Sequence, residues 1–83
     1  MKTKGRATTV DSRIGYNLQL LRRVAGLSQK QIGDNLGVSS QQIQKYESGK
    51  NRLPAAALYK LKHIYDVPYE DFFTGIEETT VTS

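Results

Sequence analysis

The sequence predicts an all-α fold, a compact arrangement of five short helices. Three observations carry this prediction: apolar residues recur at spacings of three and four, capping residues and glycines alternate along the chain, and no segment alternates as a strand does. With 83 residues, of which 37% are hydrophobic, the chain can build one small core. We expect one domain at residues 11–76, between a flexible basic arm at residues 1–10 and a disordered acidic tail at residues 77–83.

The first helix is predicted to begin at Asp11 or Ser12, because either residue is a good N-cap. Gly26 is expected to end it. Between these bounds one stripe of the helix is apolar, and it consists of Ile14, Leu18, Leu21 and Ala25.

Two Ser-x-x-Gln patterns predict the next two helices. Ser28 with Gln31 forms a capping box that opens the second helix, which ends at Gly37. Ser39 with Gln42 repeats the same capping box and opens the third.

The last two helices are indicated by prolines and apolar spacing. Pro54 is predicted as the first residue of the fourth helix, since its φ suits that position. The apolar face of this helix is Ala57, Leu58, Leu61, Ile64 and Tyr65. Residues 69–74 are expected to form the fifth helix.

Composition excludes several kinds of site. Without cysteine the chain has no disulfide and no thiolate zinc site, and its single histidine excludes a histidine metal cluster. No glycine-rich phosphate loop or carboxylate pair beside a base is present, so we expect a protein without enzymatic activity, cofactor or metal. No run approaches the roughly 18 apolar residues of a membrane span, so we expect no membrane partner, and the absence of cysteine suits a cytoplasmic protein.

The charges are separated along the chain. Residues 1–62 hold all 12 Lys and Arg and three of the eight acidic residues, a net charge of +9. Residues 63–83 hold five acidic residues and no Lys or Arg, a net charge of −5. This separation favours a polyanionic partner for the first part of the chain, although a basic surface with a solubilising acidic tail would have the same composition.

Residues 29–46 meet the steric demands of a helix-turn-helix. Gly33 provides a small side chain where the second and third helices approach each other, and Gly37 permits a positive φ at the turn. The apolar wedge between the two helices is Ile32, Leu36, Val38, Ile43 and Tyr46. Each feature is weak alone, and together they predict the motif strongly.

The segment from Gly26 to Pro54, GLSQKQIGDNLGVSSQQIQKYESGKNRLP, resembles the helix-turn-helix regulators of the Cro and lambda-repressor type, the xenobiotic-response-element family. The resemblance lies in the Gly-x-Ser-Gln start, the small residue at the helix crossing, the Gly and apolar residue at the turn, and the Glu-x-Gly ending. It implies a compact lambda-repressor-like domain that binds double-stranded DNA sequence-specifically, with residues 39–47 as the recognition helix in the major groove. It also implies a nucleoid-associated transcriptional regulator that represses by occupying its operator.

Four polar residues are expected on the outer face of the third helix, and they are Ser40, Gln41, Gln44 and Lys45. Gln can pair with adenine N6 and N7, Lys with guanine O6 and N7, and Ser with either kind of group. For a lone Gln, an ordinary polar helix face would be the better interpretation. The third helix has three closely spaced Gln together with Lys45, and this combination favours base contacts. By the resemblance, the base-reading positions are those of Ser40, Gln41 and Lys45, with Gln44 beside them.

Five further residues are candidates for contacts to DNA phosphates, and they are Gln29, Ser39, Lys50, Asn51 and Arg52. Gln29 begins the second helix, where backbone N–H groups favour an anion, and the resemblance implies a phosphate clasp there. Ser39 has pure capping as an equally good role. The three loop residues form a run of donors without an acid, and their alternative is a solvated turn.

Glu47 is the one acidic residue within the predicted binding face. Arg22 occupies the position that, by the resemblance, pairs with this Glu. We therefore expect an Arg22–Glu47 ion pair that removes the repulsion between Glu47 and phosphate.

A single domain of this size reaches half an operator, so we expect a homodimer. The candidates for its interface are the late apolar residues Tyr65, Val67, Tyr69, Phe73 and Ile76. Ile64 and Phe72 belong to the same late apolar set, and for these two residues closing the core is the favoured role. Closing the core is the alternative role of the other five. Two other functions stay open: an antitoxin-type DNA-binding partner of a second protein held through the acidic C-terminal segment, and a protein-interaction module on the same scaffold.

Overall fold

The computed structural model describes residues 9–76, and these residues form four α-helices and one 3₁₀ helix, with no strand among them. The predicted all-α class is confirmed. The elements are α1 (Thr9–Ala25), α2 (Gln29–Leu36), α3 (Ser40–Glu47), α4 (Ala55–Tyr65) and the 3₁₀ helix η1 (Tyr69–Phe73). Most of the predicted arm, residues 1–8, and the whole predicted tail, residues 77–83, lie outside the described residues.

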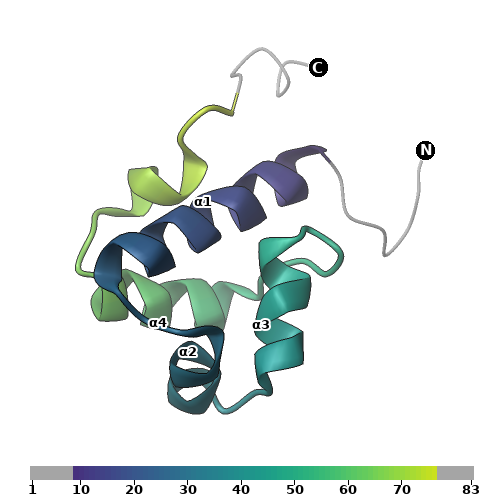
Figure 1. Cartoon of the computed structure of the whole chain (residues 1–83). Helices are drawn as coiled ribbons and strands as arrows, with labels where there is room; N and C mark the ends of the chain where they lie inside the picture. Colours follow the sequence, from purple (N-terminus) through teal and green to yellow (C-terminus); the bar gives the residue numbers. More distant parts are fainter. Residues whose placement is uncertain (1–8, 77–83) are drawn as a thin grey trace.

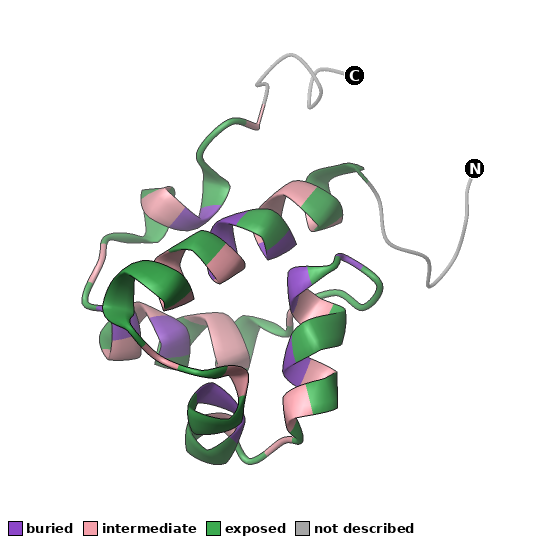
Figure 2. Ribbon diagram, in the orientation of Figure 1, coloured by how far each residue is buried: buried purple, intermediate pink, exposed green. Residues whose placement is uncertain are grey.

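The helices enclose a single core. α1 crosses above α4, α3 packs against α1, and α2 packs against α3 (Figure 1). Buried residues lie on the faces that α1, α3 and α4 turn toward one another (Figure 2). The core side chains are Leu18, Ile32, Ile43, Leu61, Tyr65 and Phe72. Since α2 and α3 have only eight residues each, they are too short to be stable alone and depend on this packing.

The capping box of α2 is confirmed. The Ser28 hydroxyl accepts from the Gln31 backbone N–H at 3.0 Å, and the Gln31 side chain accepts from the Ser28 N–H at 2.8 Å. The helix ends at Gly37, whose φ of 77° is cheap only for a residue without Cβ.

The second predicted capping box forms only in part. The Ser39 hydroxyl caps α3 by accepting from the Gln42 N–H at 3.0 Å. The Gln42 side chain does not return to the cap, however, because it donates to Asn51 in the following loop. The reciprocal half of this prediction was wrong.

Two helix starts differ from the predictions by one to three residues. α1 begins at Thr9, before the predicted Asp11 or Ser12, and Asp11 lies in its first turn, where a negative charge stabilises the helix N-terminus. α4 begins at Ala55, since Pro54 has an extended ψ of 149° and precedes the helix as its N-cap.

The predicted fifth α-helix is instead the short 3₁₀ helix η1, so the described residues hold four α-helices and not five. Only six residues separate Pro68 from Gly75, and 3₁₀ geometry suits so short a segment, as the Asp71 N–H to Pro68 carbonyl bond of 3.1 Å shows. η1 is held against α1 by the buried amide of Asn17, which donates to the carbonyls of Phe72 and Thr74 at 3.0 and 2.9 Å.

Two glycines allow the backbones around α3 to approach closely. At Gly33, a Cβ would lie 2.6 Å from the Val38 carbonyl oxygen, which confirms the predicted need for a small residue. Gly15 was not predicted to lie at a helix crossing, but a Cβ there would collide with the Tyr46 carbonyl and lie 2.6 Å from that of Glu47. α1 therefore crosses the end of α3 at contact distance, with no side chain between them.

Gly15→Ala is expected to destabilise the fold despite the better helix propensity of alanine. The added methyl group meets backbone atoms of α3, which cannot rotate away, so the change should cost about 1–3 kcal/mol of unfolding free energy. Chemical denaturation monitored by circular dichroism measures this. Val24→Ala is the matched control, because Val24 is exposed on the same helix and its replacement should be neutral or slightly stabilising. A Gly15→Ala variant as stable as this control would contradict the close crossing.

Candidate nucleic-acid interface

α3 presents a polar outer face. Ile43 is buried and Tyr46 half-buried on its inner side, whereas Gln41, Gln44 and Lys45 are exposed. Ser40 is half-buried at the first turn, and its hydroxyl donates to the Gln41 side-chain oxygen at 3.5 Å. The four predicted base-contacting residues therefore lie on one short helix, and three of them are open to a ligand.

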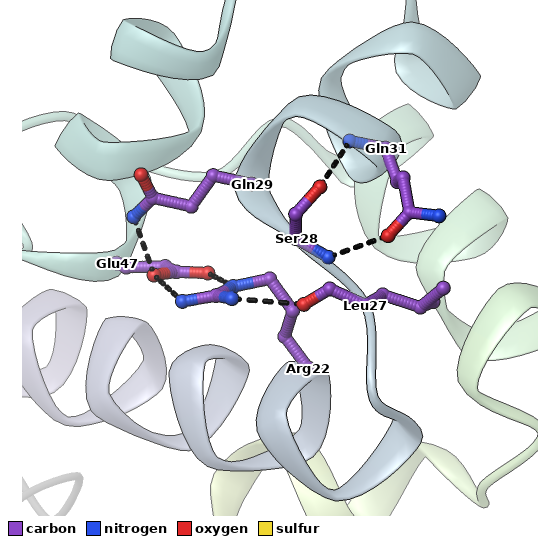
Figure 3. A network of polar contacts seen from close by, with 6 residues as sticks. All are labelled: Arg22, Leu27, Ser28, Gln29, Gln31 and Glu47. Atoms are coloured by element: carbon purple, nitrogen blue, oxygen red, sulfur yellow. Dashed lines mark hydrogen bonds and ion pairs between the residues drawn. The ribbon is translucent and has the colours of Figure 1, made fainter.

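A buried polar network lies where α1, α2 and α3 meet (Figure 3). The Arg22 guanidinium donates to both oxygens of Glu47, with Nε–Oε2 at 2.6 Å and Nη2–Oε1 at 3.1 Å. Gln29 donates to the same Glu47 Oε1 at 3.0 Å, and Arg22 Nη1 donates to the Leu27 carbonyl at 2.9 Å. The Arg22–Glu47 pair is the one expected from the sequence, and it also includes Gln29.

Burial raises the cost of breaking this network. The Arg22 and Glu47 side chains are only 11% and 3% exposed, so neither charge is well hydrated. The hydrogen bond to Glu47 raises the pKa of the Arg22 guanidinium, so Arg22 stays protonated. Glu47 is also the last residue of α3, where the helix dipole disfavours a negative charge. Arg22 therefore neutralises a carboxylate that would otherwise repel an anion and weaken the helix.

Burial and the same carboxylate also act on Tyr65 in the core. They raise the pKa of the Tyr65 hydroxyl well above its ordinary value. This tyrosine is neutral at physiological pH and contributes no negative charge behind the polar face.

The predicted phosphate contacts differ in how far they are engaged within the protein. Gln29, at the start of α2, uses one N–H on Glu47 and retains its other amide N–H. Ser39 acts as the N-cap of α3. The ammonium of Lys50 is exposed, and within the described part of the chain it has no partner.

The other two loop residues have partners inside the protein. Arg52 pairs with Asp11 of α1, Nε–Oδ2 at 3.1 Å. The Asn51 side-chain oxygen accepts from Gln42 at 3.0 Å, and its nitrogen donates to the Lys50 carbonyl at 3.0 Å. The contacts of Asp11 and Gln42 with this loop were not predicted from the sequence. The Arg52–Asp11 pair joins residues 41 positions apart, and Gln42 also fitted a local helix cap.

The predicted interface residues divide between core and surface. Tyr65 is only 9% exposed and stacks on Phe72 with ring centroids 6.4 Å apart, so it packs in the core, which is its predicted alternative role. Val67 and Ile76 are half-buried, whereas Tyr69 and Phe73 are exposed. An exposed apolar row on α1, which was not predicted from the sequence, has a spacing of four residues and consists of Tyr16, Leu20 and Val24.

Residues 9–76 hold neither a cluster of metal ligands nor a membrane-spanning helix. No group of three His, Asp or Glu side chains there could hold a metal ion. No described helix is long and apolar enough to cross a membrane.

Comparison with known proteins gives a consistent family. A helix-turn-helix domain model matches residues 15–78. An uncharacterised helix-turn-helix-type transcriptional regulator from Sinorhizobium medicae is 38% identical over 73 residues, covering 88% of this chain and 52% of that protein. An uncharacterised transcriptional regulator encoded in the ATPase CF(0) region of Rhodospirillum rubrum is 40% identical over 68 residues, covering 82% and 63% respectively. The chain spans about half to two thirds of the length of these curated relatives.

Solved structures match the fold at lower identity. The restriction-modification controller protein C.AhdI from Aeromonas hydrophila superposes with a TM-score of 0.68 at 24% identity, covering 75% of this chain and 90% of that one. The clp gene regulator ClgR from C. glutamicum gives 0.71 at 17% identity, covering 78% and 84%. These likenesses concern the fold.

Arg22→Ala is expected to destabilise the protein by about 3–5 kcal/mol, because it leaves the Glu47 carboxylate buried without its counter-charge. Urea denaturation measures the loss. Lys30→Ala is the control: it breaks the exposed Lys30–Asp34 pair and should cost at most about 0.5 kcal/mol. Equal losses for the two variants would show that the buried pair contributes no more to the free energy of unfolding than an exposed pair does.

Proposed function

The chain belongs to the helix-turn-helix family of transcriptional regulators, and from that premise we propose that it binds double-stranded DNA sequence-specifically and represses transcription by occupying an operator. The observation that carries the proposal is the outer face of α3, where Gln41, Gln44 and Lys45 are exposed while the nearby Glu47 is buried and neutralised. The protein acts by binding and not by catalysis, in the cytoplasm.

In this proposal the polar residues divide between bases and phosphates. Ser40, Gln41, Gln44 and Lys45 of α3 contact base edges in the major groove, which admits a helix of this size. Gln29, Lys50 and Arg52 contact the phosphate backbone, for which each has donors to offer: Gln29 retains an amide N–H, Lys50 its ammonium, and Arg52 its terminal guanidinium N–H groups. Ser39 orders the helix as its cap.

The proposed homodimer uses the exposed apolar surface formed by η1 and the adjoining face of α1. Tyr69 and Phe73 of η1 are 40% and 41% exposed, and Ile76 follows them. The exposed row of Tyr16, Leu20 and Val24 extends this surface along α1, against which η1 packs. A second copy on this surface would present two recognition helices to half-sites about one helical turn apart.

Selection of bound fragments from a random duplex pool tests the proposal. We expect enrichment of one motif with two-fold symmetry, and affinity that falls steeply as salt is raised, because counterions are released from the phosphates. Failure to enrich any motif, with no binding to duplexes at low ionic strength, would contradict the proposal. An asymmetric motif would contradict the dimer alone.

Gln41→Ala is expected to weaken binding to the selected duplex by about 1–3 kcal/mol while leaving binding to an unrelated duplex unchanged. The physical reason is the loss of a bidentate contact to a base edge, which only the correct sequence can make. Fluorescence anisotropy with both duplexes measures the two losses.

Lys50→Ala is the matched control, because it removes a proposed phosphate contact and not a base contact. It should weaken binding to both duplexes alike and lower the slope of log affinity against log salt by about one unit. If Gln41→Ala behaved like this control, Gln41 would not be a base reader.

A further inference from the structure

Gln42 lies among the proposed base-reading residues of α3, yet its side chain points to the protein and not to the ligand face. Its amide donates to the side-chain oxygen of Asn51 at 3.0 Å, joining α3 to the loop at residues 48–53. We propose that Gln42 and Asn51 are positioning residues, which hold Lys50 and Arg52 in register with the base-reading face of α3. This inference rests on the proposed DNA binding and adds two residues to its machinery.

Both polar atoms of the Asn51 side chain already have partners within the protein. Its oxygen accepts from Gln42, its nitrogen donates to the Lys50 carbonyl at 3.0 Å, and its backbone N–H donates to the Lys45 carbonyl at 3.2 Å. These bonds tie the residue next to Lys50 directly to the backbone of Lys45. One proposed phosphate contact and one proposed base contact therefore share a single rigid connection.

The opposite side of the loop is held by α1. Gly49 has a φ of 79°, and a Cβ there would lie 2.6 Å from the Cα of Ser12, so the loop backbone touches the first turn of α1. Arg52 is fixed to Asp11 at 3.1 Å. Between these attachments Lys50 projects into solvent, so the loop presents its cation from a backbone fixed on both sides.

A duplex fixes the spacing between a base edge and its neighbouring phosphates. A protein whose two sets of contacts are already in register does not lose conformational entropy in aligning them on binding. Because phosphate contacts carry no sequence information, disturbing the register lowers affinity for every duplex and leaves the preference among sequences unchanged.

The test is a double-mutant cycle with Gln42→Met, Asn51→Ala and the double variant of the full chain, because methionine keeps the length and helix propensity of glutamine and removes the hydrogen bond. Affinities are measured by fluorescence anisotropy for the selected duplex and for an unrelated duplex of equal length. Each single variant should weaken binding to both duplexes by the same factor, about two- to tenfold, the worth of one hydrogen bond. The double variant should be no weaker than either single one.

Gln44→Met is the matched control, because this glutamine lies on the same helix but faces outward. It should weaken binding to the selected duplex only. All four variants are compared well below their thermal midpoints, so loss of folded protein does not enter the measured affinities.

Three outcomes would overturn the inference while leaving DNA binding in place. They are a loss by Gln42→Met on the selected duplex alone, single losses that multiply in the double variant, and no loss at all. Wild-type protein that binds neither duplex would overturn the proposed function itself, and this inference with it.

Discussion

The orientation of α3 depends on one buried ion pair. Arg22 of α1 grips the carboxylate of Glu47 through two hydrogen bonds, and Gln29 of α2 donates to the same carboxylate. Polar contacts thereby fix three helices to one another at a single point. The same contact buries Glu47, the one acidic residue of α3, so the stability of the fold and the proposed DNA binding depend on the same atoms.

Close backbone contact reinforces this constraint. Gly15 lets α1 reach the carbonyls at the end of α3, and Gly33 lets α2 reach the turn before it. Because no side chain separates these backbones, α3 has little freedom to tilt or slide. A short helix can in this way be presented rigidly by a domain with only six core side chains.

The loop after α3 belongs to the same rigid unit. It is bound to α3 through Asn51 and to α1 through Arg52 and Gly49. Basic residues that look in the sequence like a solvated turn are therefore carried on a fixed frame. This arrangement suits a ligand such as duplex DNA, whose charges are regularly spaced.

The sequence by itself determined the features that depend on neighbours within four residues. Helical spacing, the Ser28 capping box and the left-handed Gly37 predicted α2 and the turn, and they located the outer face of α3, because their causes lie within one helical turn. Only the tertiary structure decided between local and distant partners. Gln42 was close enough to cap α3 but donates to Asn51 instead. Tyr65 lies in the core, and Arg52 pairs with Asp11. Gly15 lies at a helix crossing, and the predicted fifth helix is a 3₁₀ helix. Burial and the path of the chain determine the free energy of these alternatives, and neither burial nor chain path can be inferred from adjacent residues.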